Sequence, residues 1–151
     1  MQGYWRQPEA DRESFVEMDG MRYLRSGDLG YIDADGYVYI VDRIKRMINA
    51  SGFKVWPTQV EAVMHKHPSV GEVCIIAAKD PKRGETVKAL IVPKAGAAAS
   101  AEEIEAWSRE HLASYKVPRI IEFVDSLPKS GSGKVMWREL QELENRQSGA
   151  L

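Results

Sequence analysis

The sequence predicts an α+β fold: a small mixed domain with a central sheet of about three core strands flanked by helices, plus an N-terminal β-hairpin. After residue 46, strand patterns and amphipathic helical patterns follow one another in the order β-α-β-β-α-β-α. The composition, with 44% apolar and 28% charged residues, is that of a globular chain. A length of 151 residues fits one domain, or a small domain with a piece of another.

The first part of the chain shows little regular pattern. Residues 1–26 are polar and irregular, without a sustained helical or strand period, and do not look like the start of an independent fold. Residues 31–33 and 37–41 then alternate on either side of Asp35-Gly36, which predicts a hairpin. Residues 42–46 form a charged connector.

The next segment combines a β-rich stretch with a helix. Residues 47–56 favour strands, with Ser51-Gly52 as the turn between them. A helix is expected to begin at Thr58, because Thr58 and Glu61 have the spacing of a capping box, and we interpret Glu61 as a helix cap. Pro68 ends the helical pattern.

The rest of the predicted domain alternates strands with two helices. Strands are expected at 72–78, 86–93 and 119–124. Ser100 and Glu103 form a second capping box at the start of one helix. The last helix has an apolar stripe and is expected to fray from Asn145 onward; the stripe is made of Met136, Leu140 and Leu143.

The bulk properties exclude several classes of protein. A formal charge of −1 gives no electrostatic reason to expect a nucleic-acid partner. The longest apolar run is far too short to span a bilayer, and the first residues lack the apolar core of a signal peptide, so we expect a cytoplasmic protein. Cys74, the single cysteine, is expected to be a packed, inert thiol. The three histidines lack ligand spacing, so no metal site is expected.

Lys134 stands in a glycine-rich loop, Pro128-Lys129-Ser130-Gly131-Ser132-Gly133-Lys134-Val135, just before a helical pattern. Glycines allow such a loop to approach a ligand closely, and an exposed lysine can then meet an anion. A phosphate-binding P-loop is excluded, because that motif requires glycine where Pro128 stands and Ser or Thr where Val135 stands.

Five ordered motifs indicate a family. Together they resemble the C-terminal motifs of the adenylate-forming superfamily, which contains acyl-CoA synthetases, luciferases and peptide-synthetase adenylation domains. The motifs cover nearly the whole chain and are Tyr23-Leu24-Arg25-Ser26-Gly27-Asp28-Leu29-Gly30, Asp42-Arg43-Ile44-Lys45-Arg46-Met47-Ile48, Ser51-Gly52-Phe53-Lys54-Val55-Trp56-Pro57, Tyr115-Lys116-Val117-Pro118 and Pro128-Lys129-Ser130-Gly131-Ser132-Gly133-Lys134.

The resemblance implies a two-step reaction and a missing partner domain. A carboxylate attacks ATP to give an acyl-adenylate and pyrophosphate, and coenzyme A then attacks the adenylate to give a thioester. Residues 1–41 resemble the C-terminal tail of the large adenylation domain, residues 42–45 the hinge, and residues 46–151 the mobile C-terminal domain. The large domain, which would bind most of the ATP and its magnesium, has no counterpart here, so we expect the chain to be inactive alone.

The resemblance also implies roles for individual residues. Lys134 would be catalytic, bridging the carboxylate and the α-phosphate as charge builds during adenylation. Asp28 would accept hydrogen bonds from the ribose hydroxyls of ATP, and Arg43 would steady the ribose or phosphate side of the nucleotide. Asp42 would be the hinge pivot.

A second face of the small domain would serve the thiol. In the family, rotation presents the loop Ser51-Gly52-Phe53 to form the pantetheine tunnel for coenzyme A. Two positions depart from the usual pattern: Ser51 replaces the first glycine of the turn, and Gln59 stands where a glutamate is frequent. The sequence Ser51-Gly52-Phe53-Lys54-Val55 looks more like those of fatty-acyl-CoA ligases than those of amino-acid adenylation domains, which favours a fatty acid. An aryl or amino-acid adenylating domain and a freestanding accessory domain remain open.

Overall fold

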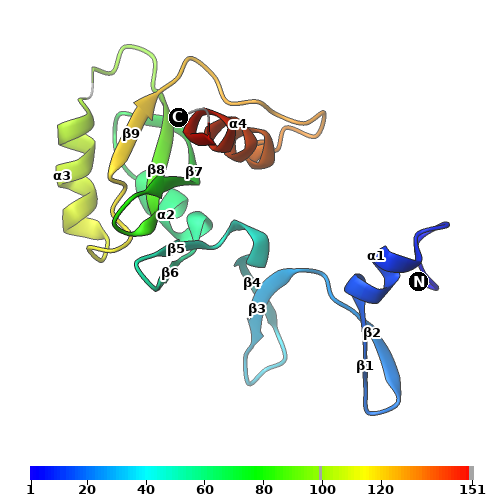
Figure 1. Cartoon of the computed structure of the whole chain (residues 1–151). Coiled ribbons are helices and arrows are strands. Elements are labelled where there is room, and N and C mark those ends of the chain that lie inside the picture. Colours follow the sequence, from blue (N-terminus) through cyan, green and yellow to red (C-terminus); the bar gives the residue numbers. More distant parts are fainter. Residues whose placement is uncertain (99, 150–151) are drawn as a thin grey trace. The chain divides into compact units, whose positions relative to one another are not determined.

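The computed structural model describes residues 1–98 and 100–149, and the chain divides into two compact units (Figure 1). Unit 1 is Met1–Lys45 and unit 2 is Arg46–Leu151. The boundary therefore falls at the end of the segment 42–45 that the sequence suggests as a hinge. Hinge motion itself stays a prediction.

Unit 1 contains one short helix and two hairpins. Its elements are α1 (Pro8–Ser14), β1 (Phe15–Met18), β2 (Met21–Leu24), β3 (Asp28–Ile32) and β4 (Val38–Arg43). The expectation that residues 1–26 are irregular is wrong, because α1, β1 and β2 lie there. A helix of seven residues and strands of four are too short to give a visible period in the sequence.

The second hairpin of unit 1 confirms the prediction made from Asp35-Gly36. β3 pairs antiparallel with β4, and the register joins Asp28 to Arg43 at its open end. A bulge interrupts the ladder between Leu29 and Gly30. Glycine is required at Gly30, because a Cβ atom there would lie 2.6 Å from the carbonyl oxygen of Tyr39.

Unit 2 is an α+β domain built on a five-stranded sheet, so the predicted fold class is confirmed. Its elements are η1 (Ile44–Arg46, shared with the boundary), β5 (Ile48–Ala50), β6 (Phe53–Val55), α2 (Pro57–Met64), β7 (Val70–Asp80), β8 (Gly84–Pro93), α3 (Ala101–His111), β9 (Ile120–Phe123) and α4 (Trp137–Gly149). The strand order is β6-β5-β8-β7, and β9 pairs with β8 in parallel. The sheet exceeds the expected three strands because the short β5–β6 hairpin extends it.

The long strands carry helices on both faces of the sheet (Figure 1). Ile75 belongs to the cluster that contains Val60 of α2 and Ile104 of α3. Its neighbour Cys74 belongs to the opposite cluster, against which Trp137 of α4 packs. This alternation is the period of a strand buried on both faces, and it explains the continuous apolar runs of β7 and β8.

Burial makes Cys74 the inert thiol that the sequence predicts. Its side chain is buried, and burial raises the pKa of the Cys74 thiol to about 12, with the Glu61 carboxylate adding to the shift. The thiolate, which is the reactive form, is therefore scarce at neutral pH.

The two predicted capping boxes have different outcomes. Ser100 and Glu103 form one at α3, with both reciprocal hydrogen bonds present. The interpretation of Glu61 as a helix cap is wrong. α2 begins at Pro57, one residue before Thr58, and the side chain of its N-cap residue, Trp56, makes no capping hydrogen bond. The Glu61 carboxylate instead accepts hydrogen bonds from Arg46, as described below.

The last helix is longer than its sequence suggests. α4 continues to Gly149 instead of fraying from Asn145. The hydroxyl of Ser148 donates a hydrogen bond to Glu144 at 3.2 Å, which supports the final turn. No helix in the described residues is both long and apolar enough to cross a membrane.

Candidate active-site elements

The structure of unit 1 brings Asp28 and Arg43 together. These residues are register partners at the end of the β3–β4 hairpin, and the Nε atom of Arg43 lies 3.1 Å from Oδ1 of Asp28. Both side chains remain open to solvent, with 55% of Arg43 and 25% of Asp28 exposed. The pair therefore presents a guanidinium and a carboxylate side by side at the surface, the groups needed to contact a phosphate and a ribose hydroxyl.

Asp42 is buried, unlike its neighbours in the charged connector. Only 5% of the residue is exposed, and its Oδ1 accepts a hydrogen bond of 2.7 Å from the backbone N–H of Arg43. A buried carboxylate fixes the local backbone by such bonds. The adjacent segment is tied to β3 by a backbone hydrogen bond of 2.9 Å from Ile44 to Gly27.

Lys134 lies in a tight loop that its backbone closes. The N–H of Ser130 donates to the carbonyl of Lys134 at 2.8 Å, and Lys129 and Val135 form an isolated antiparallel bridge. Gly133 has a φ of 80°, a conformation that other residues adopt rarely. The Lys134 residue is exposed, and within the described residues its ammonium group makes no hydrogen bond or ion pair. The loop therefore presents a free cation on a closed backbone.

The turn Ser51-Gly52 joins β5 to β6 with both residues at positive φ, 55° and 87°. This is the signature of the two-residue type I′ turn, which pairs Ala50 with Phe53. Glycine adopts this conformation freely, whereas Ser51 is strained in it. The N–H of Gly52 donates to the side chain of Asn49 at 3.0 Å, which steadies the turn.

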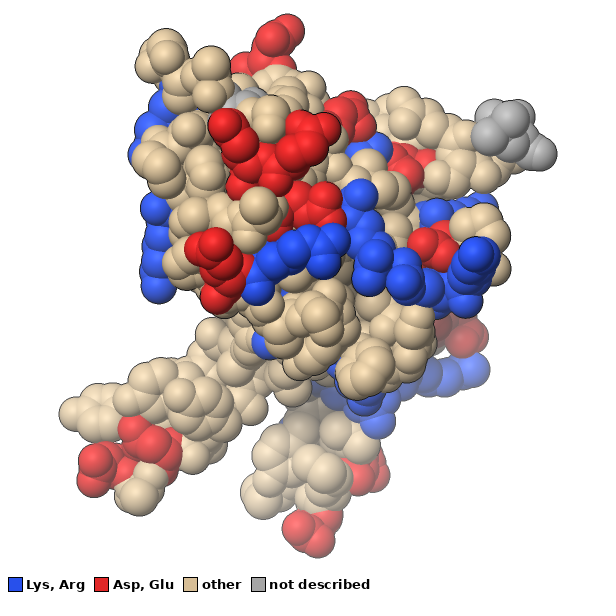
Figure 2. Space-filling model, turned by 90° about the vertical axis from the view of Figure 1, so that its left-hand side faces the viewer, with Lys and Arg blue, Asp and Glu red and all other residues tan. Residues whose placement is uncertain are grey.

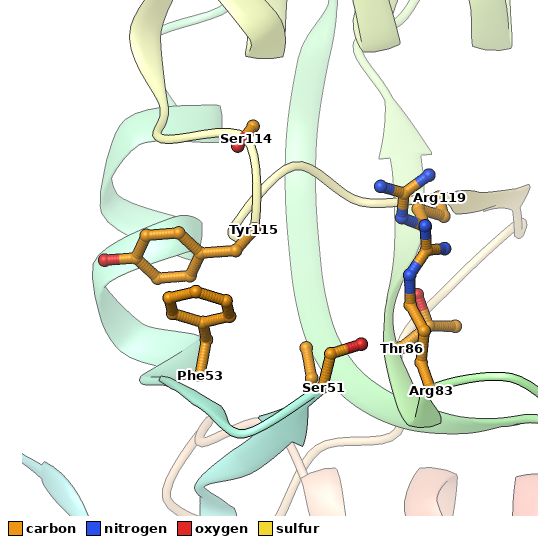
Figure 3. A pocket seen from close by; sticks show the side chains of 8 residues that line it. Ser51, Phe53, Arg83, Thr86, Ser114, Tyr115 and Arg119 are labelled. Carbon is orange, nitrogen blue, oxygen red and sulfur yellow. The ribbon is translucent and has the colours of Figure 1, made fainter.

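The turn borders a cavity of about 170 Å³ (Figure 3). The rings of Phe53 and Tyr115 stack with their centroids 4.9 Å apart and form one side of the cavity. The guanidinium groups of Arg83 and Arg119 lie on the other side, and Ser51 lies between the two sides. The remaining lining residues are Ala50, Thr86 and Ser114.

Sequence reasoning identified only part of this cavity. It placed Ser51 and Phe53 at the predicted pantetheine tunnel but gave no ligand role to Tyr115, Arg83 or Arg119. The two arginines meet because Ala50 pairs with Gly84 and β8 pairs with β9, contacts between segments far apart in the chain. No local motif marks Arg83 or Arg119. The one signal in the sequence is that each is a basic residue at or near the start of a predicted strand.

Lys134 does not line this cavity. Figure 1 shows its loop projecting next to the start of α4, whereas the β5–β6 hairpin lies at a different place in unit 2. The structure thus keeps the predicted adenylation lysine and the predicted pantetheine loop apart on a single unit.

Basic side chains gather on one face of the molecule. Figure 2 shows Lys and Arg side chains forming a band across one face, beside a separate acidic group. The formal charge of −1 therefore conceals local basic surface suited to a phosphorylated ligand. Within the part of the chain that the structure describes, no group of three or more His, Cys, Asp and Glu side chains is arranged to hold a metal ion.

Comparison with known proteins identifies the domain. Residues 59–134 match the family described as "AMP-binding enzyme C-terminal domain". The chain belongs to this family. The resemblance to the C-terminal region of adenylate-forming enzymes is thereby confirmed.

The matches to individual relatives cover almost all of this chain. The chain is 44% identical over 144 residues to a long-chain-fatty-acid–CoA ligase of Bacillus subtilis (strain 168), covering 95% of this chain and 25% of the relative. It is 43% identical over 141 residues to a feruloyl-CoA synthase of an Amycolatopsis species, covering 93% of this chain and 28% of the relative. The ATP-bound MatB structure from Rhodopseudomonas palustris superimposes with a TM-score of 0.85 at 34% identity, over 94% of this chain and 28% of that chain.

The chain spans about a quarter of the length of the curated relatives that it matches. It is therefore similar to one region of these enzymes.

Proposed function

We propose that this chain is the C-terminal part of an ATP-dependent acid–CoA ligase, which converts a carboxylic acid, ATP and coenzyme A into an acyl-CoA, AMP and pyrophosphate. The observation that carries the proposal is the presence, on one unit, of two separate elements that are suited to bind ligands. One is the exposed Lys134 on its closed loop, and the other is the cavity beside Ser51. Two half-reactions that use different faces of a mobile domain require this arrangement.

In the first half-reaction, Lys134 would act on the reacting phosphate. Negative charge builds on the α-phosphate and the attacking carboxylate during adenylation, and a preorganised ammonium group stabilises it. Asp28 and Arg43 would bind the ribose and phosphate side of the same nucleotide. Asp42 would serve as the pivot between the half-reactions. The domain division at 1–41, 42–45 and 46–151 belongs to this proposal, and the partner that completes the site is the large domain of the same enzyme.

In the second half-reaction, the cavity would receive coenzyme A. Gly52 allows a thiol arm to pass close to the backbone, since a Cβ atom there would otherwise add bulk to the turn. The stacked pair of Phe53 and Tyr115 offers an aromatic surface to a base, and Arg83 and Arg119 offer two guanidinium groups to phosphates.

A fatty acid is the proposed substrate, and an aryl acid is the second candidate. The sequence Ser51-Gly52-Phe53-Lys54-Val55 resembles those of fatty-acyl-CoA ligases. The chain is almost equally identical to a fatty-acid ligase and to a feruloyl-CoA synthase, so both a fatty acid and an aryl acid stay candidate substrates. ATP–pyrophosphate exchange by the complete enzyme, measured with palmitate and with ferulate, distinguishes them.

The mechanism is tested in a ligase in which this chain replaces the matching quarter of the Bacillus subtilis enzyme. Lys134→Ala is expected to slow pyrophosphate exchange by roughly 100- to 1000-fold and to spare thioester formation from supplied acyl-adenylate. Gly52→Leu is expected to do the reverse, because the larger side chain obstructs the thiol arm. Asp42→Pro should hinder the switch between the two states, since proline fixes φ at the pivot.

Equal loss of both half-reactions in Lys134→Ala and Gly52→Leu would show that one fixed site serves both steps. The 151-residue chain alone is expected to make no acyl-adenylate, because substrates would lack a site that positions them against Lys134. Turnover by the isolated chain clearly above that of its Lys134→Ala variant would contradict the proposal.

A further inference from the structure

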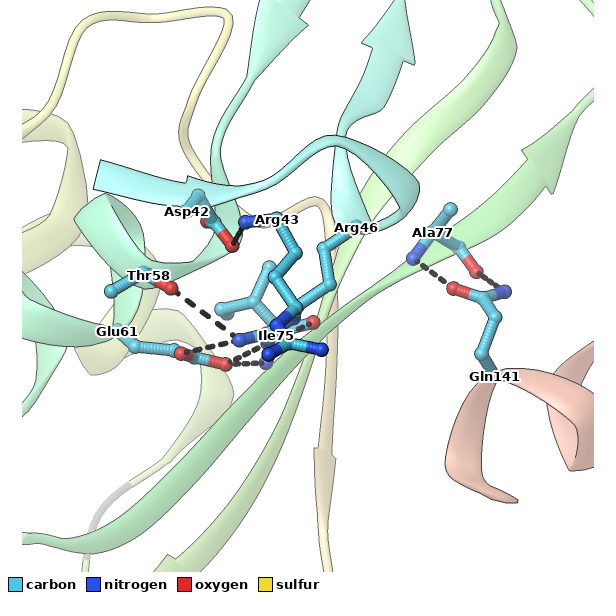
Figure 4. A network of polar contacts seen from close by, with 8 residues as sticks. All are labelled: Asp42, Arg43, Arg46, Thr58, Glu61, Ile75, Ala77 and Gln141. Atoms are coloured by element: carbon cyan, nitrogen blue, oxygen red, sulfur yellow. Dashed lines mark hydrogen bonds and ion pairs between the residues drawn. The ribbon is translucent and has the colours of Figure 1, made fainter. Parts of the chain in front are cut away.

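Arg46, the first residue of unit 2, makes several contacts to which the sequence motifs assign no role (Figure 4). Its Nη2 donates to Oε1 of Glu61 at 2.5 Å and its Nη1 to Oε2 of the same carboxylate at 3.3 Å. Nη1 also lies 3.4 Å from the hydroxyl of Thr58. Only 12% of the Arg46 side chain and 16% of the Glu61 side chain are exposed, so the pair is largely desolvated.

The pair also caps the free edge of β7. The N–H of Ile75 donates to Glu61 at 2.9 Å, and its carbonyl accepts from Arg46 at 3.3 Å. Two residues further, the side-chain amide of Gln141 bonds both the N–H and the carbonyl of Ala77, each at 2.9 Å. β7 is an edge strand, so within residues 1–98 and 100–149 these outward-facing backbone groups have no neighbouring strand to pair with. Side chains from η1, α2 and α4 take that place.

The same guanidinium reaches the start of α4. The Cζ atom of Arg46 lies 5.4 Å from the centre of the Trp137 ring, within the range of a cation–π contact. The Nε atom of Arg46 is buried and has no hydrogen-bond partner in the described residues. A buried N–H without a partner is costly, so the other contacts of Arg46 have to offset this penalty.

Trp137 connects Arg46 to the Lys134 loop. It is the first residue of α4 and follows Lys134 by three positions. The preceding residue, Met136, donates a backbone hydrogen bond of 2.8 Å to Pro128 at the other end of the loop. Both ends of the loop are thus fixed at the point where α4 begins. The position of Trp137 therefore sets the position of the Lys134 backbone.

We propose that Arg46 is a positioning residue for adenylation, which fixes the start of α4, and with it the Lys134 loop, against the edge of β7 through Glu61 and Trp137. The proposal rests on the proposed role of Lys134. An arginine is required because its planar fork bonds a carboxylate, a carbonyl and an aromatic face at once, whereas a lysine is a point charge.

Cys74 provides a local probe of this arrangement. It is the only thiol, and it is buried in the cluster against which Trp137 and Leu140 of α4 pack. Its reaction with Ellman's reagent under native conditions therefore reports how often α4 opens from the sheet. Arg46→Met is expected to speed this reaction at least about tenfold, because it leaves the Glu61 carboxylate buried without its counter-charge. Arg46→Lys should also speed it, since lysine keeps the charge but loses the fork.

Arg138→Met is the matched control. The Arg138 guanidinium lies 5.0 Å from the centre of the same Trp137 ring, but its side chain is exposed and not bonded to β7. Its removal should leave the Cys74 rate within about twofold, as is usual for surface substitutions. Hydrogen exchange in Arg46→Met should rise in residues 128–140 and stay unchanged in α3. Equal acceleration in both regions, or no acceleration of Cys74 labelling, would overturn the proposal; if Arg46→Met fails to fold, Arg46→Lys decides by the same readouts.

Activity measurements separate this inference from the proposed function. In the ligase that carries this chain, Arg46→Lys should lower kcat for pyrophosphate exchange with little change in thioester formation from supplied acyl-adenylate. If Lys134→Ala stops adenylation and Arg46→Lys leaves it intact, the positioning role fails and the proposed function stands. If Lys134→Ala itself leaves adenylation intact, the proposed function fails, and the Cys74 experiment still measures whether Arg46 holds α4.

Discussion

The two units differ in how they bury their apolar side chains. In unit 2, two clusters cover both faces of the sheet, and residues such as Ile91 and Ile104 are fully buried. In unit 1, Asp42 is the only residue in the buried class. The β3–β4 hairpin instead exposes large apolar side chains; these are Tyr31, Ile32, Tyr37, Val38, Tyr39 and Ile40.

This difference shows where the fold of the chain is self-sufficient. Two-stranded hairpins are marginally stable in water without a surface to pack on, whereas a five-stranded sheet with helices on both faces has its own core. Contiguous exposed apolar residues mark interaction sites. We therefore expect unit 2 to fold by itself and unit 1 to depend on a covering surface, which the large domain of the proposed ligase would supply.

Hydrogen exchange of the 151-residue chain gives the largest expected contrast. Amides of β7 and β8 should exchange at least about a thousandfold more slowly than those of residues 1–41, because only the former are protected up to global unfolding. Mass spectrometry of peptides from both units measures this directly. Strong protection throughout residues 1–26 would show instead that unit 1 is covered in solution, for example in a dimer that exchanges these arms.

A pair of isoleucine substitutions measures the same contrast as free energy. Ile91→Ala, at a position with no exposed surface, should lower the free energy of unfolding by about 2–5 kcal/mol. Ile40→Ala, at a position 65% exposed, should change it by less than about 0.5 kcal/mol. Urea denaturation followed by tryptophan fluorescence provides the values. Similar losses in the two variants would mean that both units share one cooperative core.

The sequence predicted the elements whose signals are local and long. β7 and β8 carry extended apolar runs, and the Ser100 capping box lies within four residues. The two strands and the capping box were therefore predicted from the sequence. The role of Glu61 was missed because its partners Arg46 and Ile75 lie 15 and 14 residues away. The spacing of a capping box often occurs by chance in a sequence. A buried ion pair between distant residues leaves no such spacing to recognise.

The candidate site follows the same rule. Lys134 and the Ser51-Gly52-Phe53 turn stand in contiguous motifs, so their positions could be read from the sequence, while their roles stay predictions. Arg83 and Arg119 join the cavity only through strand pairing, and Arg46 reaches Trp137 only through the packing of α4. Contacts of this kind depend on the tertiary fold and leave no local signal.

The ion pairs of Lys88 should give a smaller, pH-dependent effect within unit 2. Its ammonium lies 2.7 Å from Glu122 and 2.6 Å from Glu144. Burial opposes the charged form of Lys88, but the two carboxylates outweigh it and raise its pKa above the ordinary 10.5. Lys88→Met should cost about 2 kcal/mol at pH 7 by leaving the two carboxylates without their shared ammonium partner.

The direction of the pH dependence follows from the raised pKa of Lys88. The folded state binds this proton more tightly than the unfolded state, so the ion pairs stabilise fully below about pH 10.5. Their contribution is lost as the pH rises through the folded pKa. The difference in unfolding free energy between the native chain and Lys88→Met should therefore shrink in alkaline urea titrations. A difference that stays constant from pH 7 through pH 11 would indicate that the side chain acts through packing alone.

Helix capping gives the smallest expected contrast between the units. Ser100 begins α3 with its hydroxyl accepting from the N–H of Glu103 at 3.2 Å, whereas Gln7 begins α1 without a side-chain cap. Ser100→Ala should lower the stability of unit 2 by about 1 kcal/mol, because it leaves a helix N–H without its partner. Gln7→Ala should leave the same urea transition unchanged. A loss in Gln7→Ala comparable to that in Ser100→Ala would mean that α1 contributes to the cooperative unit, and the division of the chain into a self-sufficient unit 2 and a dependent unit 1 would then be wrong.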